Sequence, residues 1–198
     1  MKLVIVSGRS GSGKTTALHR LEDLGYYCVD NLPVALIPDL VANFEDDQNN
    51  GAMRIAVGID ARNRSQDLAR YSEICRRLAL INIQPQVVFL DAREDVLLAR
   101  FSSTRRRHPL SSDARSLEEA IAYERVLLDP LASRAALQLD TTTLSVHDLR
   151  ESLRRRFADA STMQNNILLT SFGFKHGVPL DADLVFDVRC LPNPHWEM

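Results

Sequence analysis

Eight residues near the start of the chain, residues 8–15, restrict its fold more than any other feature of the sequence. They read GRSGSGKT and match the spacing G-x-x-x-x-G-K-[ST] at every required position. An apolar run at residues 3–6 comes before them and a helical pattern at residues 15–24 follows. The glycines permit positive φ angles, which let backbone amides face an anion. The strand, loop and helix in this order predict a phosphate-binding loop, in which Lys14 meets the β- and γ-phosphates and Thr15 coordinates Mg²⁺.

Two alternatives compete with this interpretation of the loop. A dinucleotide fold would use Asp30, after the second predicted strand, to hold a ribose. The loop lacks G-x-G-x-x-G, however, because Gly11 and Gly13 are followed by KTT. A flexible Gly/Ser connection with an incidental lysine is opposed by the coincidence of strand, motif and helix. We therefore expect ATP or GTP with Mg²⁺, bound by Gly8, Arg9, Ser10, Gly11, Ser12, Gly13, Lys14 and Thr15.

Short β-branched runs alternate with amphipathic stretches along the chain. Strands are expected at residues 3–6, 26–29, 54–59, 87–90 and 137–139. Helices are expected at residues 15–24, 35–44, 65–81, 94–103 and 116–136, and from Ser145 onward. Ser116 and Ser145 are each followed three residues later by an acid, which predicts capping boxes at the start of the last two helices. The last helix has an apolar stripe of Val146, Leu149, Leu153 and Phe157. The alternation predicts an α/β fold with a doubly wound, mostly parallel sheet, of the kinase-like P-loop NTPase kind. Ligands lie at the carboxyl ends of such strands, and four of the expected strands are followed by Asp30, Asp60, Asp91 and Asp140.

These strand-end acids are candidates for metal binding and catalysis. Asp60 ends an apolar strand that we expect beside the phosphate loop, where a second Mg²⁺ ligand commonly acts through water. Asp91 has the same local pattern, and a turn or a helix cap explains either acid as well. Asp30 occupies the place from which small kinases take a proton off the acceptor hydroxyl. A cap ahead of Pro33 explains Asp30 at least equally.

A basic segment precedes Pro109 and includes Arg105, Arg106, Arg107 and His108. It is typical of the mobile, arginine-bearing lid of small kinases, which screens phosphate charge during transfer. The alternative is a solvated basic turn. Together with Lys14 and Asp30, we treat Arg105 and Arg106 as the candidate catalytic residues.

Composition limits the partners and the compartment. The 24 Lys and Arg against 26 Asp and Glu give a net charge of −2, so no positive field attracts RNA, and we expect the chain as given to bind RNA poorly. Three scattered cysteines, Cys28, Cys75 and Cys190, fit a reducing compartment. No apolar run approaches the length of a membrane span. We therefore expect a cytoplasmic protein without a membrane partner, and self-association to a homo-oligomer stays open.

The end of the chain follows a different pattern. Residues 165–170 and 184–188 are expected to be strands, joined by SFGFKHG without an intervening helix. A segment this short cannot bury a core of its own. We expect a nucleotide-binding domain at residues 1–160 and the beginning of a second α/β domain at residues 161–198.

Several motifs in order resemble the RapZ/YvcJ family of bacterial nucleotide-binding proteins along the whole chain. They are SGRSGSGK from Ser7, YCVDNLP from Tyr27, DARN from Asp60, TRR with HPL from Thr104, SFGFKHG from Ser171, and DVR with LPNPHW from Asp187. The resemblance implies ATP binding at residues 8–15, hydrolysis of ATP and GTP, and guanine-nucleotide binding at Asp60, Ala61, Arg62 and Asn63. A role of residues 60–63 toward the metal or phosphates of the same nucleotide is the alternative.

The resemblance also implies partners and a longer protein. Family members bind small regulatory RNAs, and an RNase adapter among them delivers one to RNase E and so controls amino-sugar synthesis. These functions belong to a C-terminal domain, and we expect this chain to be truncated within it. Two functions therefore compete: a nucleotide-responsive adapter with weak ATPase or GTPase activity, and a small-molecule kinase with Asp30 as base and residues 105–107 as lid. The resemblance favours the adapter.

Overall fold

The computed structural model of the 198-residue chain describes residues 1–45, 53–104, 107–158, 171–176 and 184–187. The chain divides into two compact units, Met1–Met163 and Gln164–Met198. In the second unit, Phe174–His176 form a 3₁₀ turn, and the rings of Phe172 and Phe174 lie 5.1 Å apart. Residues 184–187 have no regular secondary structure, so the strand expected at 184–188 is wrong over its described part. The strand expected at 165–170 lies outside the described residues.

The first unit is built on a sheet of five strands in the order β2-β3-β1-β4-β5, all paired in parallel. The central strand carries Leu3, Val4, Ile5 and Val6, each at most 1% exposed. Burial on both faces explains why the three inner strands read as continuous apolar runs rather than as alternating patterns. The strand bounds are β1 Lys2–Gly8, β2 Tyr27–Val29, β3 Arg54–Ile59, β4 Gln86–Asp91 and β5 Leu137–Asp140.

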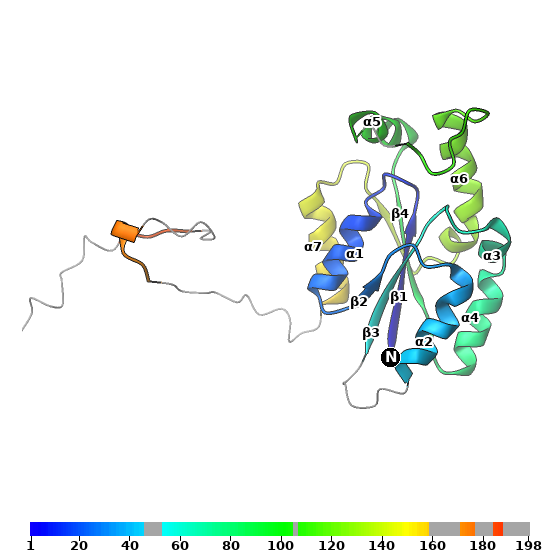
Figure 1. Ribbon diagram of the computed structural model, residues 1–198, viewed down its shortest axis with the longest axis horizontal. Coiled ribbons are helices and arrows are strands. Elements are labelled where there is room, and N and C mark those ends of the chain that lie inside the picture. Colours follow the sequence, from blue (N-terminus) through cyan, green and yellow to red (C-terminus); the bar gives the residue numbers. More distant parts are fainter. Residues whose placement is uncertain (46–52, 105–106, 159–170, 177–183, 188–198) are drawn as a thin grey trace, which may run out of the picture. The chain divides into compact units, whose positions relative to one another are not determined.

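Helices cover both faces of this sheet (Figure 1). On one face α1 (Lys14–Asp23) and α7 (Val146–Phe157) pack on Val4 and Val6. On the other face lie η1 (Val34–Leu36), α2 (Ile37–Glu45), α3 (Ser65–Ala69), α4 (Tyr71–Leu80) and α6 (Leu117–Ala132). The helix α5 (Glu94–Thr104) lies beyond the carboxyl ends of the strands and packs through Leu97 and Phe101 on Ile121 of α6.

Three expected helices differ from the observed ones. The single helix expected at 65–81 is two helices, because the chain turns at Arg70, whose N–H bonds the carbonyls of Gln66 and Asp67. Both pieces pack on α6 and η1, and the second packs on α2 as well. The expected helix 35–44 begins as the 3₁₀ turn η1, and the helix expected to reach residue 136 ends at Ala132.

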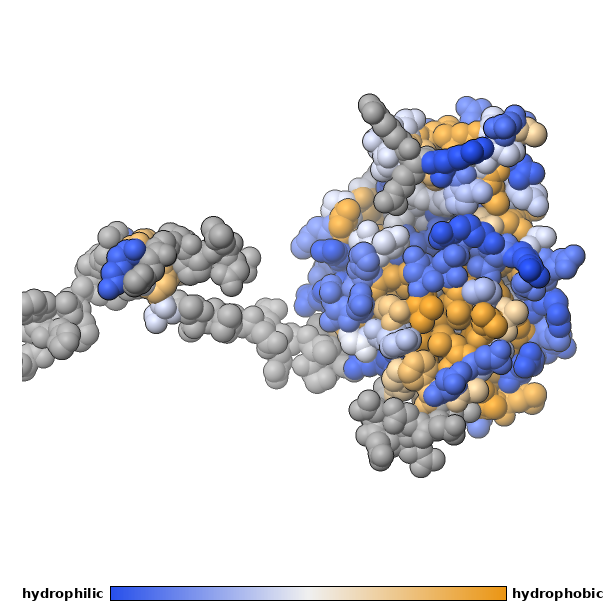
Figure 2. Space-filling model, viewed as in Figure 1, coloured by the Kyte–Doolittle hydropathy of each residue, from blue (hydrophilic) through white to orange (hydrophobic). Residues whose placement is uncertain are grey.

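Serine side chains cap two of the helices as the sequence predicts. Ser116 accepts the N–H of Glu119, whose carboxylate accepts the N–H of Ser116 in return. Ser145 and Asp148 form the same box at the start of α7. Both helices begin at the carboxyl edge of the sheet (Figure 1). Figure 2 shows that edge as a hydrophilic belt above an apolar area over α2.

Leu153 on α7 provides a test of the packing that supports this edge. Its side chain is fully buried in the cluster between α1, α7 and the sheet. We expect Leu153→Ala to lower the free energy of unfolding by about 2–5 kcal/mol, because it leaves a cavity. Val146, which the sequence pattern places on the same apolar stripe, is 60% exposed. Val146→Ala is therefore the control, with an expected change within about 0.5 kcal/mol. Urea unfolding measures both, and equal losses would contradict the assignment.

Candidate functional site

The loop between β1 and α1 follows a path that requires glycine. Gly8, Gly11 and Gly13 have φ angles of 148°, 84° and 104°. A Cβ atom on Gly8 would overlap the carbonyl of Leu90 in β4, and one on Gly13 would lie 2.9 Å from Cδ2 of Leu149 in α7. The loop is therefore held closely between the sheet and α7. Its last glycine also caps α1, so that the amino end of the helix opens at the loop.

Lys14 folds back over this loop. Its Nζ donates to the carbonyl of Gly8 at 2.7 Å and to that of Arg9 at 3.2 Å. Burial lowers the pKa of Lys14, while the charges of Glu124, Asp60 and Asp30 act in the opposite direction, in that order of size. The charges of Asp30 and Asp60 therefore reach the ammonium group of Lys14. Thr15, the candidate metal ligand, is exposed in the first turn of α1.

Asp60 is buried and paired with Arg62. The Arg62 guanidinium donates through Nη2 to Oδ2 at 2.5 Å and through Nε to Oδ2 at 2.9 Å. The backbone N–H of Arg62 and its Nε reach the other oxygen, Oδ1, at 2.9 and 3.2 Å. Burial alone would raise the pKa of Asp60, but these bonds and the charge of Lys14 outweigh it, so the pKa lies below its ordinary value. Asp60 is consequently ionised, with both oxygens already accepting hydrogen bonds.

Asn63 fastens the segment after β2 to the end of β3. Its Oδ1 accepts the N–H of Val34 at 2.8 Å, and its Nδ2 donates to the carbonyl of Leu32 at 3.3 Å. Ala61 is 2% exposed and contributes to the same buried turn. The side-chain amide of Asn63 is therefore engaged within the protein. Of the residues 60–63, Arg62 is the one whose side chain is half exposed.

Asp30 approaches β3 because Gly58 has no side chain. A Cβ atom at Gly58 would lie 2.5 Å from Oδ1 of Asp30. The same Oδ1 accepts the N–H of Asn31, whose φ of 52° turns the chain away from β2. Asp30 is exposed, so its carboxylate remains open to a ligand.

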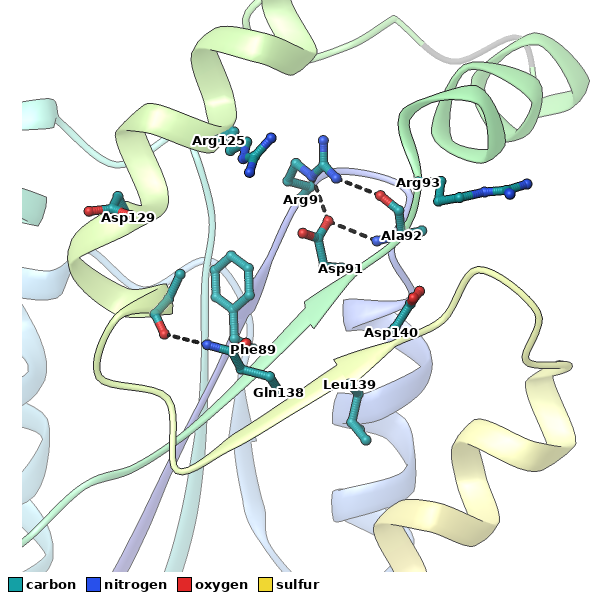
Figure 3. Close-up of a pocket in the computed structure, with 11 residues that line it drawn as sticks. Arg9, Phe89, Asp91, Ala92, Arg93, Arg125, Asp129, Gln138, Leu139 and Asp140 are labelled. Atoms are coloured by element: carbon teal, nitrogen blue, oxygen red, sulfur yellow. Dashed lines mark hydrogen bonds and ion pairs between the residues drawn. The ribbon is translucent and has the colours of Figure 1, made fainter.

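Arg9 leaves the loop on the other side and pairs with Asp91 (Figure 3). Its Nε donates to Oδ1 of Asp91 at 2.5 Å, and its Nη2 donates to the carbonyl of Ala92 at 2.5 Å. Both side chains line a groove of about 600 Å³, toward which Arg125 of α6 also points. The charge of Asp60 acts on Lys14 more strongly than that of Asp91 does. Of these two strand-end acids, Asp60 is therefore the better candidate for a role beside the lysine.

Glu124 is a site residue that the sequence analysis missed. Its carboxylate is 0% exposed and accepts the Ser10 N–H at 2.8 Å and the Ser10 hydroxyl at 2.7 Å. His108, itself 2% exposed, lies with Nε2 3.1 Å from Oε2 of Glu124. A usable signal was present, since Glu124 continues the buried face of α6 formed by Ala120, Ile121, Leu128 and Leu131. An acid within the buried apolar stripe of a helix is costly unless a hydrogen-bond donor or a positive charge compensates it.

Arg100 and Thr141 complete the rim of the loop and were also missed. Arg100 on α5 donates through Nη1 to the carbonyl of Gly11 at 2.9 Å and through Nη2 to the carbonyl of Thr141 at 2.7 Å. The Thr141 hydroxyl donates to the carbonyl of Ser12 at 3.0 Å. Neither residue belongs to a motif with recognisable spacing, so no local pattern pointed to them.

The expected basic lid is only partly described. Arg105 and Arg106 lie outside the described residues, and their catalytic role stays a prediction. Arg107 is exposed and lies 3.7 Å from Asp113. His108, by contrast, is buried against Glu124 and the ring of Phe101, so this part of the segment is no solvated turn.

The described residues lack two features that would point to other functions. No cluster of three or more His, Cys, Asp or Glu side chains suited to hold a metal occurs among them. Within the same residues, no helix is both long enough and apolar enough to span a membrane.

Sequence comparison relates the chain to proteins of known family. The RapZ-like N-terminal domain matches residues 1–161, and the RapZ C-terminal domain matches residues 165–198. A nucleotide-binding protein of Hahella chejuensis is 52% identical over 197 residues, which cover 100% of this chain and 69% of that protein. The nucleotide-binding protein PputGB1_0956 of Pseudomonas putida is 53% identical over 197 residues, with the same coverage.

Solved structures with a similar fold include two with a TM-score of 0.50. One is an unliganded sugar kinase of Janibacter, 19% identical, matching 78% of this chain and 93% of its own. The other is the YorR protein of Bacillus subtilis in complex with phosphorylated GDP, 18% identical, matching 78% of this chain and 95% of its own. At these identities the likeness shows the fold alone, and it confirms the predicted kinase-like P-loop architecture.

The hydrogen bond that the Asn63 side chain accepts from Val34 can be tested by substitution. We expect Asn63→Ala to lower the free energy of unfolding by about 1–3 kcal/mol, because the buried N–H of Val34 loses its acceptor. Asn43→Ala, on the exposed side of α2, is the control and should change it by less than about 0.5 kcal/mol. Urea unfolding compares the two. If Asn63→Ala matched the control, the side-chain amide would be free to serve a ligand instead.

Proposed function

This chain belongs to the RapZ family, and from this premise we propose that it binds nucleoside triphosphate through residues 8–15. The observation that carries the proposal is the loop itself. Three glycines at positive φ, the amino end of α1 and the ammonium group of Lys14 converge on one place. Backbone amides and a lysine in this arrangement are an anion site suited to a polyphosphate.

The bonds of Lys14 within the loop are those that a phosphate would replace. Lys14 donates to the carbonyls of Gly8 and Arg9, and a phosphate oxygen is a stronger acceptor for a charged donor than a carbonyl is. We propose that Lys14 exchanges these carbonyls for the β- and γ-phosphates. The proposed nucleotide-binding residues are Gly8, Arg9, Ser10, Gly11, Ser12, Gly13, Lys14 and Thr15.

Mg²⁺ fits the same place through oxygen donors. The Thr15 hydroxyl lies at the exposed start of α1, and the ionised Asp60 lies within the electrostatic reach of Lys14. Because Arg62 occupies both oxygens of Asp60, we propose that Asp60 acts on the ion through water rather than by direct contact. A bound Mg²⁺ would neutralise phosphate charge.

We propose one nucleotide site for ATP and GTP. The turn of residues 60–63 is tied to Leu32 and Val34, and the charge of Asp60 acts on Lys14, which supports a role at the phosphates rather than in a second pocket. Arg62, half exposed and within the electrostatic reach of the same lysine, is the member of this turn that can meet a phosphate.

The activity we propose is slow hydrolysis of the bound nucleotide by a cytoplasmic regulatory protein. In this view residues 1–160 respond to the nucleotide, and residues 161–198 begin a C-terminal domain, in line with the RapZ domain matches. By the family resemblance, small regulatory RNA and RNase E are the proposed partners of the whole protein, through that C-terminal domain.

A small-molecule kinase is the second candidate, and the position of Asp30 favours it. The exposed Asp30 carboxylate lies at the strand edge and acts electrostatically on Lys14, where a base for an acceptor hydroxyl would stand. Incubation with labelled ATP and a set of hydroxylated metabolites separates the two functions. Stoichiometric transfer to a metabolite would establish the kinase, whereas release of phosphate alone supports the adapter.

Lys14→Ala tests the proposed loop. Removing the charged donor should weaken nucleotide binding by about 10- to 100-fold, because a hydrogen bond from a charged group is lost. Hydrolysis should fall with it. Calorimetric titration measures the affinity, and far-UV circular dichroism verifies the fold. Arg20→Ala, which removes a cation from the last turn of the same helix, is the control and should bind as the unmodified chain does. Undiminished binding by Lys14→Ala would place the nucleotide elsewhere.

The metal assignment rests on a comparison of two acids. We expect Asp60→Asn to reduce the gain in nucleotide affinity that Mg²⁺ provides by about tenfold, as for other residues that act on a metal through its water shell. Asp91→Asn should leave that gain nearly unchanged, because Asp91 faces Arg9 and the groove. Titrations with and without Mg²⁺ measure both variants. The reverse order would move the metal acid to β4.

A further inference from the structure

The buried carboxylate of Glu124 is the strongest feature that the proposed function leaves unexplained. It comes from the middle of α6, yet it bonds the third residue of the phosphate loop through both the N–H and the hydroxyl of Ser10. Glu124 and the side chain of His108 are both 0% exposed. Burying an acid completely costs free energy unless its charge is compensated, so the presence of Glu124 beside the loop requires an explanation.

The surroundings of Glu124 hold its charge in one place. His108 Nδ1 accepts the N–H of Leu110 at 3.1 Å, so the proton of the neutral ring is on Nε2, which donates to Glu124. Burial alone would raise the pKa of Glu124, but the bonds from His108 and Ser10 and the charge of Lys14 hold it below the ordinary value. With three donors converging on it, the carboxylate is ionised and cannot rotate away from the loop.

This fixed negative charge acts on the same lysine as a bound phosphate would. The carbonyl of Arg9, which accepts from Lys14, and the N–H of Ser10, which donates to Glu124, belong to one peptide group, so both side chains are held at the same point of the loop. Among the charged groups around Lys14, Glu124 has the largest effect, ahead of Asp60 and Asp30. Two anions that share one cation in a region of low dielectric constant repel each other strongly. Each phosphate added to the ligand increases its negative charge near Glu124, and a third phosphate adds its charge to a lysine that Glu124 and the β-phosphate would already share.

We propose that Glu124 determines how many phosphates the loop prefers, by disfavouring the third phosphate of a nucleoside triphosphate relative to the diphosphate. The proposal rests on the nucleotide site proposed above and adds a specificity residue to it. Glu124 acts by its charge, and Ser10 and His108 keep that charge in position.

Glu124→Gln removes the charge while the contacts can be kept. The amide oxygen, in place of Oε2, accepts from the Ser10 N–H and from His108. The amide nitrogen, in place of Oε1, donates to the Ser10 hydroxyl, which can also accept. We expect affinity for a non-hydrolysable ATP analogue to rise about tenfold relative to the affinity for ADP, while the ADP affinity stays within about twofold.

Three further measurements make the test decisive. Glu118→Gln removes a carboxylate from the exposed first turn of the same helix, and should leave the ratio of the two affinities unchanged. Glu124→Asp keeps a charge near the loop and should remain closer to the unmodified chain than Glu124→Gln does. In the unmodified chain, titration of AMP, ADP and the triphosphate analogue should show a smaller gain from the third phosphate than from the second.

The outcomes separate this inference from the proposed function. If the unmodified chain gains more from the third phosphate than from the second, the inference is overturned whether or not Glu124→Gln folds. An unchanged ratio in a folded Glu124→Gln, or an equal rise in Glu124→Asp, also overturns it while nucleotide binding stands. If the unmodified chain binds neither ADP nor the analogue, the proposed function fails, and this inference fails with it.

Discussion

The backbone of the phosphate loop lies against β4 so closely that no side chain fits at Gly8. A Cβ atom there would overlap the carbonyl of Leu90, which instead accepts the N–H of Arg9 at 3.2 Å. This contact fixes where the loop begins and sends the side chain of Arg9 toward Asp91. The chain then turns through Gly13 into α1, which returns Lys14 over the loop. The surrounding acids can act on Lys14 only because this turn holds the lysine in one position.

The net charge of the chain is close to zero, but charged side chains are concentrated around that turn. Asp60 is paired with Arg62 on one side of the loop, and Asp91 is paired with Arg9 on the other. Glu124 is compensated differently, by the neutral donors Ser10 and His108 and by the field of Lys14. Arginine pairs neutralise the flanking acids locally, whereas the charge of Glu124 is directed at the lysine. The net charge of the chain therefore says little about the field that a ligand meets.

The sequence predicted the elements whose signals are local. The apolar strands, the glycine-rich loop and the capping boxes at Ser116 and Ser145 depend on neighbouring residues, and all are present. The break at Arg70 could not be predicted, because no Gly or Pro marks it in the sequence. Glu124, Arg100 and Thr141 belong to the site through contacts between distant segments. The roles of Arg105 and Arg106 stay predictions.

The bonds of the loop also bear on the order of folding. Ser12 accepts from Thr141, 129 positions later, and Ser10 donates to Glu124, 114 positions later. Contacts of such sequence separation form late, because the entropy of closing a long loop opposes them. During synthesis the glycine-rich segment leaves the ribosome early, while the groups that shape it arrive only with α6 and the end of β5. A nascent chain thus carries the motif long before it carries the site, and cannot capture nucleotide until most of the domain has been made.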